Sequence, residues 1–259
     1  MPAPRSLFER ALHPFKIALT KPYWPAALLV VRHGESEHNV ARDLFNSEPA
    51  FWENLRNVRD ADIQLTARGL EQARQTGVAL AAFPKFDVCI ASPYERTMQT
   101  ARAIAGQLPY HLEIEVDELV REKEFGHLQG FHWDEIKAKF PEQFEFRKRD
   151  GVYYYRPPGG QSFLDKMVEV RLFADKLARK WAGKRVLVVS HSGTIKLFKA
   201  LFENFHEDGF LETTHIPNCA VQEFRIDCSE RPAGKLKLAR QDLVLYDPTL
   251  ASKPKTASS

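Results

Sequence analysis

The feature of this sequence that most constrains its fold is the alternation of short apolar runs with segments of helical periodicity. Three runs are dominated by apolar side chains: residues 27–31, 86–90 and 185–189. Such runs are typical of strands that are covered on both faces. Because helix-like segments separate them, the pattern predicts a three-layer α/β/α sandwich around a mostly parallel sheet. Two further signals are an edge strand at 112–116 and a hairpin over 220–226 and 235–246.

Polar residues mark the expected helix starts. Thr66 and Ser162 each precede apolar residues at helical spacing, as N-cap residues do. Residues 92–95, Ser-Pro-Tyr-Glu, have the form of a capping box with proline at the first helical position. The helix after Ser162 carries three apolar residues spaced four apart: Leu164, Val168 and Leu172. Another helix is expected after Ser192.

We expect one main domain, from residue 27 to residue 249. Within it, residues 125–158 are rich in aromatic and charged side chains and predict a helical insert over the site. Residues 1–26 are interpreted as a surface arm, with a transit peptide as the alternative, because they lack the unbroken apolar stretch of a secretory signal. Residues 250–259 are expected to form a disordered polar tail.

The composition excludes several classes of protein. The 37 lysines and arginines nearly balance 34 acidic residues, for a net charge of +3, which argues against nucleic acid as a bulk partner. No apolar run is long enough to span a membrane. Three cysteines without metal-ligand spacing predict no disulfide framework and favour a reducing, cytoplasmic location.

Two histidines and two arginines lie at or just beyond the ends of the three apolar runs. Arg32 and His33 follow the first run, Arg96 lies just beyond the second, and His191 follows the third. The carboxyl ends of parallel strands meet at one edge of a sheet, where α/β proteins bind ligands. Because the arginine fork matches two phosphate oxygens, this grouping predicts a phosphate pocket.

These motifs resemble the signature of the histidine phosphatase superfamily, whose fold is called phosphoglycerate mutase-like. The resemblance runs through six blocks in family order: 29–36 with Asn39, 65–73, 91–101, 119–130, 158–162, and 189–193 with 217–218. The first and last histidine blocks are highly specific together. The resemblance implies the same three-layer fold.

The resemblance also implies roles. His33 would be the catalytic nucleophile, with Glu122 as the proton donor to the leaving oxygen and then the base for water. The phosphoryl oxygens would be held by Arg32, Asn39, Arg96, His191 and Ser192. We expect substrate contacts from Ser36, Lys123, Tyr155 and Arg156. No metal or cofactor is expected, because the arginines and His191 supply the positive charge that phosphoryl transfer requires.

Three features depart from the family pattern. Ser192 follows the second histidine where many members have glycine, and Gln161 replaces a common glutamate. The stretch 41–64 is longer than a short family loop and carries Trp52 and Arg56. That stretch either shapes the substrate entrance or forms a surface helix.

The preferred function is metal-independent hydrolysis of a small phosphorylated metabolite, without nucleic acid or membrane, and with a homodimer left open. A phosphoglycerate mutase-type phosphotransferase is the main alternative, although the Gly-Trp segment of mutases is absent after Asn39. A metal-dependent hydrolase would use His33, His191 and Glu122 as ligands. A phosphate-binding scaffold protein is disfavoured, because those three residues are all present.

Overall fold

A six-stranded mixed sheet forms the centre of the computed structural model, which describes residues 23–204, 207–212, 215–227 and 235–251. The strands run in the order β3-β2-β4-β1-β5-β6. Their bounds are β1 Ala27–Arg32, β2 Val88–Ala91, β3 Ile114–Val116, β4 Arg185–Ser190, β5 Val221–Asp227 and β6 Lys235–Leu243. Strands β1 to β4 run parallel to one another, whereas β5 pairs antiparallel with β1, and β6 pairs antiparallel with β5 at one edge. The parallel strands therefore deliver their carboxyl ends to one side of the molecule.

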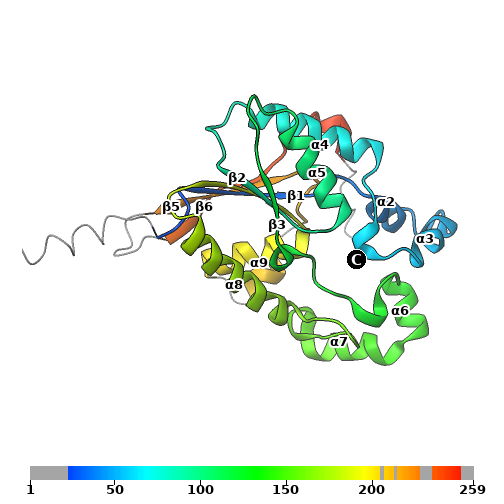
Figure 1. The fold of residues 1–259 in the computed structure, drawn as a ribbon. Coiled ribbons are helices and arrows are strands. Elements are labelled where there is room, and N and C mark those ends of the chain that lie inside the picture. Colours follow the sequence, from blue (N-terminus) through cyan, green and yellow to red (C-terminus); the bar gives the residue numbers. More distant parts are fainter. Residues whose placement is uncertain (1–22, 205–206, 213–214, 228–234, 252–259) are drawn as a thin grey trace, which may run out of the picture.

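Helices cover both faces of the sheet (Figure 1). Helices α4 (Ala67–Leu80) and α5 (Glu95–Ala105) lie on one face, and α8 (Phe163–Lys180) and α9 (Ser192–Glu203) on the other. The alternation of side chains along β1 builds both cores. Leu28 and Val30 pack in the cluster with α8 and α9, while Leu29 and Val31 pack in the cluster with α4 and α5. The predicted three-layer sandwich is confirmed.

Four helices lie beyond the carboxyl ends of the parallel strands. They are α2 (Glu37–Asp43), α3 (Pro49–Arg56), α6 (Trp133–Lys139) and α7 (Pro141–Tyr154). Figure 1 shows α6 and α7 projecting from the sandwich, on the same side as α2 and α3. Helix α10 (Glu207–Glu212) and four short 3-10 segments complete the described helices: η1 Asp60–Asp62, η2 Glu118–Val120, η3 Gly126–Leu128 and η4 Pro248–Leu250.

One local prediction was wrong, and one apolar stripe does not face the core. Helix α5 starts at Glu95 with Tyr94 as its N-cap, so Ser92 does not cap it and Pro93 lies outside it. On α8, the stripe Leu164, Val168 and Leu172 is about half exposed. The core contacts come instead from the opposite side of the helix, through residues such as Val170 and Phe173. The predicted arm and tail lie mostly outside the described residues.

Candidate active site

His33 stands directly after β1 and is 5% exposed. Its Nδ1 lies 2.7 Å from the Gly34 carbonyl oxygen, which can only accept a hydrogen bond. Nδ1 must therefore carry the ring proton, and Nε2 keeps its lone pair. Burial, together with the charges of Arg96 and Arg32, holds the pKa of His33 well below 6.5. The ring is thus neutral at neutral pH, with the Nε2 lone pair that a nucleophile needs.

Two arginines bring positive charge to His33. Arg32 is buried and donates from Nη1 to the Ile216 carbonyl at 2.6 Å. Burial lowers its pKa to about 10, so it remains charged at neutral pH. Its Nε is buried and has no hydrogen-bond partner among the described groups. Arg96, in the first turn of α5, lines the same cavity as His33.

His191 lies beside His33, with ring centroids 5.4 Å apart. Its Nε2 is 2.9 Å from the Ser92 hydroxyl. That hydroxyl accepts from the Tyr94 amide at 3.4 Å, which leaves its own proton to be donated to Nε2. Burial and the charge of Arg96 hold the pKa of His191 well below 6.5, so the neutral ring carries its proton on Nδ1. The buried Nδ1 has no partner in the described part of the chain. With Nε2 occupied, Nδ1 is the atom of His191 that can donate to a ligand. Ser92, which was predicted to cap a helix, instead contacts His191 within the site.

The loop after β1 is held by a network of amides. Ser36 caps α2, and Asn39 closes a capping box with it. The Asn39 side-chain oxygen accepts from the Ser36 amide at 3.2 Å and from Asn218 Nδ2 at 3.0 Å. Asn218 Nδ2 also donates to the His33 carbonyl at 3.1 Å. The Asn39 amino group is therefore the part left to donate to a ligand.

Glu122 is the acidic residue of its segment that lines the same cavity as His33. Its Oε1 accepts from the Lys123 amide and its Oε2 from the Gly193 amide, each at 3.0 Å. It lines the His33 cavity, whereas Glu118 and Glu124 pair with Arg121 outside that cavity. The two hydrogen bonds from backbone amides fix the direction of the Glu122 carboxyl group.

Most of these groups line a cavity of about 360 Å³, called the His33 cavity below. His191 is fully buried beside His33 and does not itself line this cavity. The cavity contains the predicted residues Arg32, His33, Ser36, Asn39, Arg96, Glu122 and Ser192. Aromatic side chains from two regions complete its walls: Trp52, Phe131 and Trp133. Trp52 Nε1 donates to Glu135 at 3.1 Å and Arg56 also pairs with Glu135, which ties α3 to α6. The 41–64 stretch therefore forms part of the entrance.

A second recess of about 410 Å³ shares Glu122, Phe125 and Ser192 with the His33 cavity. The remaining lining residues are mostly apolar or basic: Lys123, Val152, Phe163, Gly193, Lys196 and Phe210. Lys123 is buried and donates to the Gln161 carbonyl at 2.9 Å, and burial lowers its pKa to about 8. The recess thus adjoins the predicted acid.

Two predicted substrate contacts lie elsewhere. Tyr155 is buried in the small core of the insert, where its hydroxyl donates to Gln143 at 2.9 Å. Arg156 pairs with Asp165 at the surface. Neither residue lines the His33 cavity or the adjoining recess.

Two residues of the site were not among the predicted site residues. Asp60 lines the His33 cavity and binds Arg96 through both carboxylate oxygens. The Tyr94 ring lies against both His191, at 4.9 Å between centroids, and the Arg96 guanidinium, at 4.7 Å. Tyr94 and Asn218 fall in the recognised blocks 91–101 and 217–218, whereas Asp60 falls in none.

Two features are absent from the described residues. Those residues hold no group of three or more His, Cys, Asp or Glu side chains placed to bind a metal. None of the helices in that part of the chain combines the length and apolar character needed to cross a membrane.

Known proteins provide an independent comparison. A family model described as histidine phosphatase superfamily (branch 1) matches residues 28–236. A 2,3-bisphosphoglycerate-dependent phosphoglycerate mutase from Sinorhizobium fredii is 33% identical over 65% of this chain and 75% of its own. The same enzyme from Azorhizobium caulinodans is 30% identical over 71% of this chain and 85% of its own.

Solved structures show the same fold. The alpha-ribazole phosphatase from Shigella flexneri superposes with a TM-score of 0.66 at 23% identity, over 85% of this chain and 98% of its own. A mycobacterial glucosyl-3-phosphoglycerate phosphatase complexed with inorganic phosphate gives 0.65 at 20% identity, with the same coverage.

Proposed function

The chain belongs to the histidine phosphatase superfamily, and on that premise we propose that it is a metal-independent phosphomonoester hydrolase with a phosphohistidine intermediate on His33. The observation that carries the proposal is the contact between His33 Nδ1 and the Gly34 carbonyl at 2.7 Å. It leaves the Nε2 lone pair available in a cavity that also contains Arg32 and Arg96. Neutral nucleophile and fixed cations are what attack on a negatively charged phosphate ester requires.

In the first step, His33 Nε2 forms a bond to phosphorus as the bond from phosphorus to the leaving oxygen breaks, in line. Arg32 and Arg96 balance the charge on the phosphoryl oxygens. His191 Nδ1 and the Asn39 amino group supply further donors. The proton on Glu122 passes to the leaving oxygen, so the alcohol departs neutral.

In the second step, the Glu122 carboxylate takes a proton from water. The water oxygen bonds to phosphorus, the phosphorus–Nε2 bond breaks, and His33 returns to its neutral form. Glu122 is then protonated again, and inorganic phosphate remains bound beside Arg32 and Arg96. The same carboxyl group thus acts first as acid and then as base.

The lining of the recess supports an alcohol leaving group with apolar or aromatic character. Phe125, Phe163 and Phe210 lie beside Glu122, where that group would depart. A phosphoglycerate carries a second charged group close to the ester, which the three phenylalanines do not favour, although Lys123 and Lys196 place positive charge in the same recess. The identity of 33% to a phosphoglycerate mutase nevertheless makes phosphoryl transfer to a second phosphoglycerate the runner-up function.

A panel of phosphomonoesters tests the proposal. Aryl phosphates, alkyl phosphates and 3-phosphoglycerate, the last with and without 2,3-bisphosphoglycerate, are incubated with the protein and followed by ³¹P NMR. We expect release of inorganic phosphate, fastest from aryl esters. Isomerisation of 3-phosphoglycerate without phosphate release would support the mutase alternative instead. Phe163→Ala should raise KM for aryl esters, whereas the surface variant Phe146→Ala should not.

A further inference from the structure

Asp60 places a carboxylate on the arginine that is expected to bind phosphate. Arg96 donates from Nη1 and Nη2 to the two Asp60 carboxylate oxygens, each at 3.1 Å, and Nη1 also donates to the Asp60 carbonyl at 2.5 Å. The side chains of Arg96 and Asp60 are only 6% and 15% exposed. Both line the His33 cavity. The ion pair is therefore part of the cavity wall.

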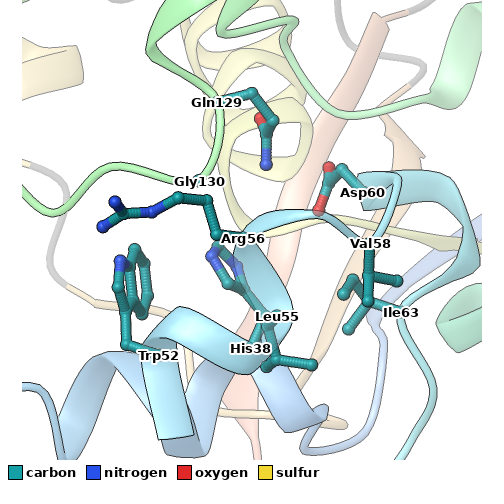
Figure 2. A pocket seen from close by; sticks show the side chains of 9 residues that line it. All are labelled: His38, Trp52, Leu55, Arg56, Val58, Asp60, Ile63, Gln129 and Gly130. Atoms are coloured by element: carbon teal, nitrogen blue, oxygen red, sulfur yellow. The ribbon is translucent and has the colours of Figure 1, made fainter. Parts of the chain in front are cut away.

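The proposed chemistry does not require this carboxylate. Glu122 already supplies the acid and base, and Asp60 comes from the separate segment η1. Figure 2 shows the Asp60 and Gln129 side chains turned toward the same small space beside His38. The other charged side chains of the His33 cavity are Arg32, Arg42 and Glu122.

A carboxylate and a phosphate compete for the same donors. Both are oxyanions that bind an arginine fork through two parallel hydrogen bonds. A phosphate that takes the Nη edge of Arg96 must displace Asp60. One that takes another edge still lies near a negative charge in a poorly solvated site. In either geometry, Asp60 weakens the binding of phosphate.

We propose that Asp60 competes with phosphate for Arg96 and so limits how tightly the site retains its inorganic phosphate product. A hydrolase must release phosphate from a cradle of cations, and an internal carboxylate lowers the free energy of that release. This inference rests on the proposed function only in requiring that Arg96 bind phosphate.

Direct titration with inorganic phosphate tests the inference without relying on turnover. Isothermal titration calorimetry compares wild type with Asp60→Asn and with the control Asp62→Asn. Asp62 lies in the same segment, but it pairs with the exposed Arg59 at 2.7 Å. We expect Kd for phosphate to fall by about tenfold in Asp60→Asn, the effect of one charged hydrogen-bonded group, and to stay at the wild-type value in Asp62→Asn.

An unchanged or raised Kd for phosphate in Asp60→Asn would overturn the inference. If Asp60 only oriented Arg96, its replacement would weaken phosphate binding and raise Kd. Asp60→Ser provides a second uncharged variant in which the same fall is expected. If wild type and all three variants bound phosphate with the same Kd, the competition would be contradicted, but the proposed phosphate site would not. No binding by any of them would contradict the proposed function as well.

Discussion

Alanine at position 193 should displace the carboxyl group of Glu122, the proposed acid and base. A Cβ built on Gly193 would lie 2.5 Å from Glu122 Oε1 and 3.1 Å from Phe163 Cε1. Because van der Waals contact needs about 3.5 Å, the carboxyl group must retreat by roughly 1 Å. The hydrogen bond of 3.0 Å from the Gly193 amide to Oε2 is strained or lost in the same movement.

The expected cost falls on catalysis more than on folding. A misplacement of about 1 Å lowers rates by roughly 100-fold, and a hydrogen bond to a carboxylate contributes about 1.5–3 kcal/mol. The end of a flexible side chain can move aside, so the fold should persist. We expect kcat for an alkyl phosphate to fall about 100-fold, with little change in Tm.

Leaving-group dependence provides the sharper assay. The p-nitrophenolate ion departs without a proton, so His33 should still be phosphorylated by p-nitrophenyl phosphate in Gly193→Ala. The water attack still needs Glu122 as base. Stopped-flow should therefore show a burst of nitrophenolate followed by slow turnover.

A second glycine supplies the control. A Cβ on Gly106 comes no closer than 3.3 Å to the Arg102 carbonyl oxygen, so Gly106→Ala should keep the wild-type rate. Wild-type kcat for alkyl phosphates in a folded Gly193→Ala protein would refute the role assigned to Glu122.

Three further predictions follow from the site. The lowered pKa of His33 means that the ring stays neutral as pH falls through 6.5. Therefore ¹⁵N NMR of the ring should show its protonation only below that pH. A titration midpoint at 6.5 or above would be inconsistent with the burial of His33 and the two nearby arginines. Ser92→Ala removes the contact of 2.9 Å to His191 Nε2 and should lower kcat/KM about tenfold. The control Thr66→Ala, at a true N-cap, should cost about 1 kcal/mol of stability without lowering kcat/KM. Equal losses of activity in the two variants would count against the role of Ser92. Full activity should persist in EDTA, and inactivation that added metal reverses would favour the metal-dependent alternative.

The layers of the fold could be predicted because each depends on a local pattern. Apolar runs identify buried strands, and Thr66 and Ser162 do cap the helices that follow them. The apolar stripe on α8 does not mark the buried side, because spacing along a helix defines a face but does not say which face meets the sheet. Leu164 is 47% exposed, while Val170 on the other side is fully buried.

The site was less accessible to sequence reasoning where contacts join distant segments. Arg32, His33 and His191 could be named because each ends a strand. The pairing of Asp60 with Arg96 spans 36 positions and depends on how the 41–64 stretch folds back. Likewise, Ser92 has the local form of a helix cap, and only the packing of β2 against β4 brings it to His191.

Trapping the phosphoenzyme tests the central claim most directly. Wild type and His33→Ala are mixed with a ³²P-labelled phosphomonoester, quenched in alkali, digested and mapped by mass spectrometry. The account predicts an acid-labile, alkali-stable phosphoryl group on the wild-type peptide that contains His33, and neither label nor turnover in His33→Ala. Label on another residue, no acid-labile phosphoenzyme, or full turnover by His33→Ala would contradict it.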